Sequence, residues 1–300
     1  MLNSSEIKQT NVLQLRRFQN VPANLDLSRL SDDERDMYGF PPTDSNASLD
    51  SYILEKLKRF TLREPQFEPR VSDFAAVAAF SAGAGVETRP TWSGGVTFPA
   101  VNETFAFVEG TWTLPQIAAP QGPAGGQVIA SVWTGIDGDG ISQDVLQAGI
   151  DINGTSANGN FEQSMRAWLQ WYPGASQAIS NFPISPADIV NVSIRVAPNA
   201  SNSASIFVGN VTTKIGMHFG ATAAPGVALV GNCAEWIVEA PIGLPLAQFG
   251  RVEFTGCSAQ TSDGHTVGLQ SGNAINMVSN NRILATSQIV GPAEVLVQST

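Results

Sequence analysis

Cysteine and histidine are scarce in this 300-residue sequence, which contains two of each. Cys233, Cys257, His218 and His265 do not stand at the spacing of zinc ligands, so no structural zinc site is expected. A Ser-His-Asp or Cys-His mechanism would need one of the two histidines, and no serine lies in a G-x-S-x-G context. The shortage predicts chemistry based on carboxylates and amides, without a metal ion or cofactor.

Basic residues and long apolar runs are also few. The 16 Lys and Arg stand against 26 Asp and Glu, and the formal net charge of −10 disfavours non-specific nucleic-acid binding. No segment approaches the ~20 apolar residues of a membrane-spanning helix, and the N-terminus lacks the apolar stretch of a secretory signal. Residues 71–300 hold only 6 basic and 15 acidic groups. With few ion pairs to lose, such a chain is expected to tolerate low pH.

The first 70 residues carry helical signals. Ser31 and Glu34 match a capping box, and a set of apolar residues recurs at helical spacing: Leu49, Tyr52, Ile53, Leu57 and Phe60. The YGFPP run at 38–42 separates two expected short helices. Residues 71–90, which are rich in Ala and Gly, are predicted to be a linker. We therefore expect a helical segment at 1–70 and one domain at 91–300.

From about residue 91 the pattern changes to short alternating runs between Gly, Pro and Asn, which is typical of an all-β fold. With 43% hydrophobic residues the chain can form a substantial core. Nine or more strands are expected, at 104–114, 127–137, 143–151, 161–172, 188–197, 203–208, 233–240, 250–256 and 282–290.

Side-chain alternation gives four of these strands one apolar face and one mixed face. On these mixed faces, the strand at 127–137 carries Trp133 and Asp137, and the strand at 143–151 carries Gln147 and Asp151. The strand at 161–172 carries Arg166, Trp168, Gln170 and Tyr172, and the strand at 233–240 carries Glu235 and Glu239. Large aromatics among carboxylates and amides favour a concave binding groove. The alternative is an ordinary solvated face with a few exposed aromatics.

Four motifs follow in order along these strands: VWTGIDGD at 132–139, VLQAGID at 145–151, AWLQWYP at 167–173 and AEWIVE at 234–239. Together with WSGG at 92–95, they make residues 91–290 resemble the glutamic peptidases, or eqolisins. The YGFPP run is similar to a segment found upstream in bacterial members of that family.

The resemblance implies an antiparallel β-sandwich of two large sheets, of the concanavalin A or lectin type, with a groove across one sheet. It also implies an endopeptidase, usually acid-acting, with a Gln/Glu dyad and polypeptide substrates. By motif the dyad is Gln147 and Glu239. Alternation places Glu235 on the same face, and four residues of strand span ~13 Å, so only one glutamate is expected to face Gln147 directly.

In such a dyad Glu239 would take a proton from water and later donate it to the leaving nitrogen, while Gln147 would stabilise the oxyanion. The motifs also assign positions that line or support the groove, although simple packing is the alternative for each: Trp133, Asp137, Asp151, Trp168, Tyr172 and Glu235. Gln170 stands where the family often has Glu. If it lies near Glu239, the missing carboxylate is expected to lower the pKa of Glu239.

Several questions stay open at this stage. Cys233 and Cys257 either pair across a sheet or remain buried thiols. Asp137, Asp139 and Asp144 vaguely suggest a calcium loop but lack EF-hand spacing, so no metal is expected. A rival function is a non-catalytic, lectin-like sandwich that binds carbohydrate or peptide. The family implies secretion, and we expect a monomer.

The basic residues of the N-terminal segment suggest two roles for it. As a prosegment, the stretch from Lys56 to Arg70 would lie against the acidic domain at neutral pH and leave as carboxylates protonate. The alternative is a permanent helical appendage packed on the sandwich.

Overall fold

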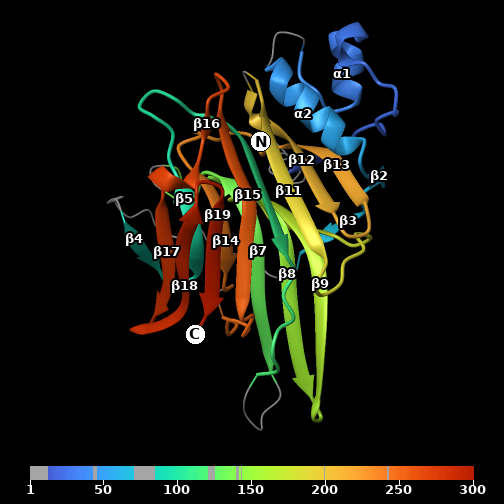
Figure 1. Ribbon diagram of the computed structural model, residues 1–300. Coiled ribbons are helices and arrows are strands. Elements are labelled where there is room, and N and C mark those ends of the chain that lie inside the picture. Colours follow the sequence, from blue (N-terminus) through green and yellow to red (C-terminus); the bar gives the residue numbers. More distant parts are fainter. Residues whose placement is uncertain are drawn as a thin grey trace, which may run out of the picture.

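The backbone is mostly antiparallel β-strand, as expected for an all-β chain (Figure 1). The computed structural model describes residues 13–42, 46–70, 85–120, 126–139, 142, 144–198, 200–241 and 243–300. Most of the expected linker, residues 71–84, and the first residue of the strand expected at 143–151 therefore lie outside the described residues. Among those described, no helix is long and apolar enough to cross a membrane.

One half of the sheet carries the four motifs. Its strands, in hydrogen-bonded order, are β3 (Phe67–Pro69), β10 (Gln177–Ile179), β9 (Asn160–Tyr172), β8 (Val145–Ala157), β7 (Gln127–Ile136), β14 (Ala234–Glu239), β5 (Trp92–Thr97), β17 (Asn273–Ser279) and β4 (Val86–Arg89). Strands β7, β8, β9 and β14 are neighbours here, which places the motifs side by side.

The other half continues from β17. Its strands are β18 (Arg282–Gly291), β19 (Glu294–Ser299), β15 (Arg251–Thr261) with β16 (Thr266–Val267), β6 (Phe105–Thr113), β11 (Ile189–Ala197), β12 (Ala200–Asn210) and β13 (Ile215–Thr222). Because β17 pairs with both β5 and β18, the described strands form one 19-stranded sheet. The expectation of two separate sheets is corrected in this respect.

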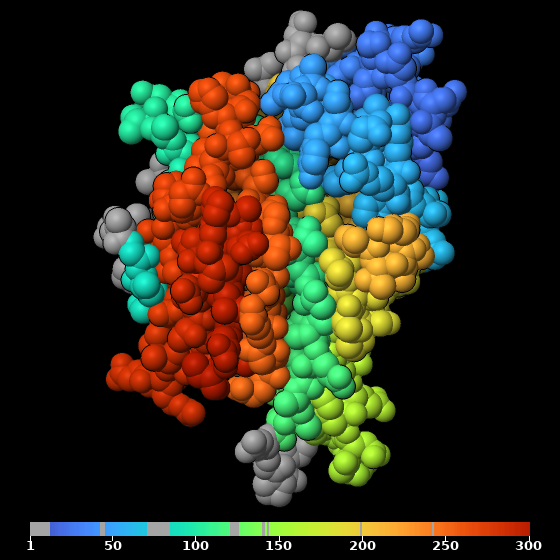
Figure 2. Space-filling model, viewed as in Figure 1, coloured from blue at the N-terminus to red at the C-terminus, as the bar shows by residue number. Residues whose placement is uncertain are grey.

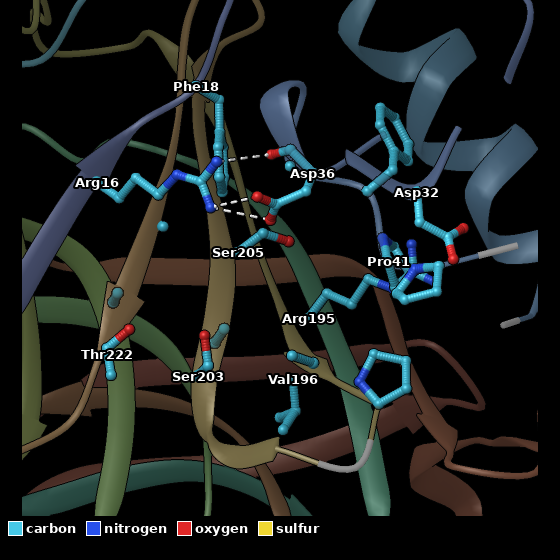
Figure 3. A pocket seen from close by; sticks show the side chains of 18 of the residues that line it. Arg16, Phe18, Asp32, Asp36, Pro41, Arg195, Val196, Ser203, Ser205 and Thr222 are labelled. Carbon is cyan, nitrogen blue, oxygen red and sulfur yellow. Dashed lines mark hydrogen bonds and ion pairs between the residues drawn. The ribbon is translucent and has the colours of Figure 1, made fainter. Parts of the chain in front are cut away.

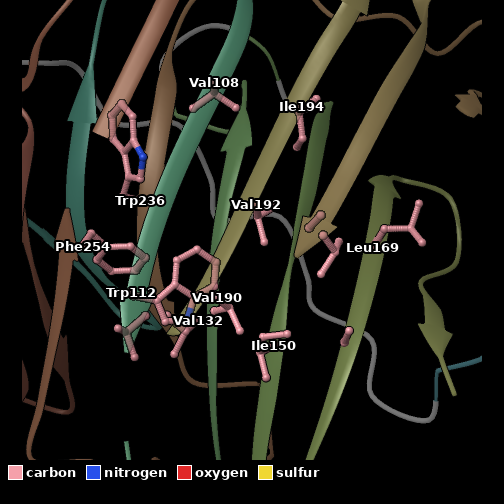
Figure 4. Close-up of a cluster of buried hydrophobic side chains, with 14 of the residues drawn as sticks. Val108, Trp112, Val132, Ile150, Leu169, Val190, Val192, Ile194, Trp236 and Phe254 are labelled. Atoms are coloured by element: carbon pink, nitrogen blue, oxygen red, sulfur yellow. The ribbon is translucent and has the colours of Figure 1, made fainter. Parts of the chain in front are cut away.

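The two halves pack face to face through their apolar sides. Val132 and Ile150 of the first half join one buried cluster with Val108 and Val192 of the second (Figure 4). The Trp236 side chain lies in this core, and its indole N–H donates to the Glu109 backbone oxygen at 2.8 Å. Burial of these apolar faces holds the motif strands in a fixed register.

An N-terminal layer, residues 13–42 and 46–70, covers the outer side of the second half. It contains β1 (Gln14–Arg17), a 3-10 turn (Leu27–Arg29), α1 (Asp32–Met37), α2 (Ala47–Leu57), β2 (Thr61–Leu62) and β3. Its helices lie at one end of the molecule, coloured blue in Figures 1 and 2. The predicted capping box of Ser31 and Glu34 begins α1, and Leu49, Ile53 and Leu57 of α2 are buried. Tyr52 is half exposed, and Phe60 lies beyond the helix.

All nine expected strands are present, but several differ in length from the prediction. The structure also contains strands that were not predicted. The strand expected at 143–151 extends to Ala157, and that at 203–208 covers Ala200–Asn210. Strand β5 is buried along its whole length and contains two glycines, so it has no alternating pattern to detect. Strands β13, β17 and β19 and the short edge strands were also not predicted.

Candidate active site

The predicted mixed face exists, and most of it is buried, with exposed Arg166 and half-buried Tyr172 as the exceptions. Trp133, Trp168 and Ile237 form one cluster with Trp92, separate from the main core that contains Val132, Trp171 and Trp236. Gln147 and Glu239 are each only 2% exposed. The structure therefore shows a closed site rather than an open groove or an ordinary solvated face.

The strand register orders the site into transverse rows. Glu239 pairs with Ser131, Ser131 with Asp151, and Asp151 with Arg166. A second row lies four residues away from the first along each strand. In it, Glu235 pairs with Gly135, Gly135 with Gln147, and Gln147 with Gln170. By register, Gln147 therefore shares its row with Glu235, and Glu239 lies in the row of Asp151.

The indole of Trp133 spans the distance between these two rows. Its N–H donates to a carboxylate oxygen of Glu239 at 2.9 Å. Its six-membered ring extends over Gly135, where an added Cβ would lie 3.1 Å from the ring and 3.3 Å from Cβ of Gln147. Trp133 thus contacts Glu239 at one end and lies beside Gln147 at the other.

Gln147 is held by a second amide. Its side-chain nitrogen donates to the Gln170 oxygen at 3.3 Å, and Gln170 donates in turn to the Gly174 backbone oxygen at 3.0 Å. Among the described residues, the Gln147 side-chain oxygen has no hydrogen-bond partner. Gln170 is therefore a neighbour of Gln147, and the proposed effect of its missing charge on Glu239 has no contact to support it.

Burial dominates the chemistry of Glu239. It raises the pKa of this carboxyl to about 8, against the lowering effects of the Trp92 and Trp133 N–H groups and the Arg70 charge. The Asp151 carboxylate adds a smaller upward contribution. Glu239 is therefore protonated at acid pH in this closed arrangement.

Glu235 has a different environment. It is fully buried, and the Cys233 thiol donates to it at 3.3 Å. Burial, followed by the nearby Asp139 charge, raises the pKa of Glu235 well above its usual value. Glu235 thus differs from Glu239 in its partner, which is a thiol in place of an indole N–H.

Asp137 and Tyr172 lie at the margin of the site. Asp137 accepts backbone N–H bonds from Val230, Gly231 and Asn232 at 2.6, 3.0 and 2.7 Å, and so fixes the loop that leads into β14. Asp139 forms an ion pair with Arg89. Asp137 and Asp139, whose spacing vaguely suggested a calcium loop, thus each bind groups of the protein itself. Half-buried Tyr172 ends β9 and pairs with Val145.

Asp151 binds a residue from the N-terminal layer. The Arg70 Nε donates to Asp151 at 2.8 Å, and Ser131 donates to the same carboxylate at 2.7 Å. The guanidinium carbon of Arg70 lies 3.8 Å from the centroid of a Trp168 ring. Arg70 is thus a site residue that the motifs did not reveal, because it precedes the matching region and only its charge was suggestive.

Trp92 is the second residue that the predicted site omitted. Its ring packs edge-on against Trp133, with 5.1 Å between ring centroids. The WSGG motif was the sequence signal for it, although β5 showed no strand pattern. Cys233 and Cys257 are both buried and free, which answers the open question of their pairing.

Two other features lie away from these residues. A cavity of about 350 Å³ lies between part of the N-terminal layer and β11–β13, and its lining includes the ion pair of Arg16 and Asp36 (Figure 3). The described residues that line it include none of the predicted site residues. Half-buried Glu103 and exposed Asp263 and His265 bring possible metal-ligating atoms within 4.8 Å of one another.

Known proteins resemble the chain over the same region. The sequence model of the peptidase A4 family matches residues 90–299. Aspergillopepsin-2 from Aspergillus niger is 29% identical over 224 residues, covering 68% of this chain and 76% of that protein. Scytalidopepsin B from Scytalidium lignicola is 30% identical over 219 residues, covering 65% and 80%.

Solved structures agree with the sequence matches. Scytalido-glutamic peptidase with a transition state analog inhibitor aligns with a TM-score of 0.59 and 26% identity, over 70% of this chain and 98% of that one. Aspergilloglutamic peptidase from Aspergillus niger aligns with a TM-score of 0.51 and 29% identity, over 58% and 99%. The resemblance carried by the four motifs is confirmed, and the chain belongs to the peptidase A4 family, the eqolisins.

Proposed function

We propose that the chain is an endopeptidase that hydrolyses polypeptides with Glu239 as general base and acid and Gln147 as oxyanion stabiliser. The observation that carries this is the Trp133 indole, which holds the Glu239 carboxyl on the face where Gln147 lies. Solved relatives support it, since one is a complex with a transition state analog inhibitor and another with the tripeptide Ala-Ile-His.

The reaction needs only water and these two side chains. Ionised Glu239 takes a proton from water as the water oxygen bonds to the scissile carbonyl carbon, whose oxygen becomes negative. The carbon–nitrogen bond then breaks as Glu239 returns the proton to the nitrogen. One product gains a carboxyl and the other an amine, and Glu239 is ionised again.

Gln147 has the groups that this mechanism asks of it. One of its amide N–H bonds is used by Gln170, which leaves the second N–H for the oxyanion. Its oxygen, which lacks a hydrogen-bond partner among the described residues, is available to accept from the attacking water.

The pKa of Glu239 indicates that this is a closed form. With a pKa of about 8 the carboxyl is protonated at acid pH and cannot take a proton from water. Because burial is the largest cause of the shift, water that enters an opened groove would lower the pKa again. We infer that the groove opens before catalysis at acid pH.

The rival binding function has less support. Sugar-binding sheets present aromatic side chains as open platforms, whereas Trp133 and Trp168 are fully buried here.

For the N-terminal layer, we propose the permanent appendage rather than the prosegment. Lys56 of α2 is buried and bonds Glu109 at 3.1 Å and Ser193 at 2.7 Å. Arg35 and Arg195 both pair with buried Asp50, which joins the layer to β11. Removal of the layer would take Lys56 from Glu109 and Asp50 from Arg195, and it would expose the apolar surface of Phe107 and Phe207.

We further propose that the folded-over sheet is the lectin-like sandwich that the family resemblance implies, and that the protein is an extracellular monomer. The linker expected at 71–90 is corrected at its end, because Val86–Arg89 form β4, which pairs with β17.

The test uses a denatured protein substrate between pH 2 and 7, with new termini identified by mass spectrometry. We expect Glu239→Gln to lose about 10²–10⁴-fold in rate and Gln147→Ala ~10²–10³-fold. Glu235→Gln is the matched control and should keep its activity. Loss of cleavage in Glu235→Gln with retention in Glu239→Gln would reverse the assignment, and no cleavage by the parent chain would favour the binding module.

A further inference from the structure

A cavity of about 330 Å³ opens on the site-bearing sheet where the row of Glu239 and Asp151 ends. Its lining includes Arg70, Asp151, Asn153, Ser164, Arg166 and Leu244. Asp151 and Asn153 of β8, and Ser164 and Arg166 of β9, are register partners and share one face of the sheet. The cavity therefore extends the face of the proposed dyad toward solvent.

Arg166 is the charge in this cavity that is available to a ligand. It is exposed, and among the described residues it makes no hydrogen bond or ion pair. Arg70, in contrast, is engaged with Asp151 and stacked on Trp168, so these two opposite charges offset each other. Glu162 lies on the same strand, β9, four residues before Arg166. It is also exposed, but it does not line the cavity. The cavity thus offers one net positive charge.

We propose that this cavity is a substrate subsite in which Arg166 binds an acidic side chain of the polypeptide. The inference rests on the proposed endopeptidase function and adds a substrate preference to it. Arg166 is three strands from Glu239, or about 14 Å at the usual strand spacing. An extended peptide covers this in about four residues, so the acidic side chain lies three or four residues from the scissile bond.

The geometry suits a carboxylate better than its neutral analogue. A guanidinium binds a carboxylate through two parallel N–H bonds, and such charged bonds are about twice as strong as neutral ones. A glutamine of the same shape accepts only one of them. We expect at least about tenfold discrimination between Glu and Gln, reduced by salt because Arg166 is exposed.

The test is a set of eight-residue peptides built on alanine, each with Glu, Gln or Lys at a single position, assayed at pH 6 for kcat/KM. The wild type should prefer Glu at one position about tenfold. Arg166→Ala should remove that preference and Arg166→Glu should shift it toward Lys. Arg282→Ala, which alters an exposed arginine of β18, is the matched control and should leave it unchanged.

A binding measurement separates this inference from the proposed function. Fluorescence anisotropy with the Glu239→Gln variant compares the Glu and Gln peptides at pH 6 and pH 3, and the difference should vanish at pH 3 as the peptide carboxyl is protonated. A preference in binding without cleavage by the wild type would overturn the endopeptidase and keep the subsite. Equal kcat/KM and equal Kd for Glu and Gln at every position would overturn the subsite.

Discussion

Glu239 combines a proposed catalytic role with a cost to folding. Its pKa is about 8 in the folded chain and near 4.5 when unfolded, so the native state binds more protons between these values. Stability must then fall as pH rises through this window. Trp92, Arg70 and Trp133, in that order, partly stabilise the ionised form and lower the pKa of Glu239.

Glu239→Gln should therefore be about as stable as the wild type at pH 4 and more stable at pH 8, by an amount on the order of 3–5 kcal/mol. Urea unfolding at both pH values measures this difference. Glu162→Gln removes an exposed carboxyl on the same face and serves as the control, with no comparable change. A Glu239→Gln variant that gains nothing at pH 8 would show that the carboxyl is solvated in solution.

At the scale of elements, the site depends on how closely the strands approach one another. Gly149 of β8 pairs with Trp133 of β7, and an added Cβ would lie 2.2 Å from the Val132 oxygen and 2.5 Å from the Trp133 Cβ. The absence of a side chain at Gly149 thus lets the Trp133 indole reach Glu239. Gly149 belongs to the VLQAGID motif, but the sequence did not show which atoms it approaches.

We expect Gly149→Ala to destabilise the protein by about 1–3 kcal/mol and to reduce cleavage, because backbone and Trp133 must both shift. Gly126→Ala is the control, since an added Cβ there meets nothing within 4 Å. Thermal unfolding and kcat/KM, measured for both variants, test this prediction. Equal behaviour would mean that β7 and β8 adjust freely at this point.

The elements themselves were predictable to different degrees. The Ser31 and Glu34 capping box and the alternating β7, β8, β9 and β14 follow from local hydrogen bonding and from the two-residue period of a strand. Strand β5 did not follow, since its sequence WSGGVT contains two glycines and has no alternation of apolar and polar side chains.

For the whole molecule, the distribution of ion pairs changes the interpretation of composition. Residues 71–300 hold few charges, which suggested tolerance of acid. In the structure, however, buried ion pairs connect Lys56 with Glu109, Arg70 with Asp151, and Arg195 with Asp50. These pairs join the N-terminal layer to the domain, so the chain has charge contacts that its composition does not reveal.

The permanent layer makes a prediction about truncation. A chain that begins at residue 85 should not fold stably, because Glu109 loses Lys56, and Phe107 and Phe207 lose the apolar residues of the layer that pack on them. Full-length protein held for hours at pH 3 to 4 should keep the layer, as judged by mass spectrometry and gel filtration. A new N-terminus between residues 59 and 90, with departure of the layer and full cleavage activity, would instead establish the prosegment.

The sequence by itself determined the all-β class, the helical start, the family and the strand face that carries Gln147 and Glu239 of the proposed dyad, because these depend on periods and motifs that span only a few residues. The tertiary structure alone decided the closed state of Glu239, the single continuous sheet, and the contact of Arg70 with Asp151, which lies 81 residues away. Burial and charge contacts between distant segments depend on how the whole chain closes, and no local pattern encodes that closure.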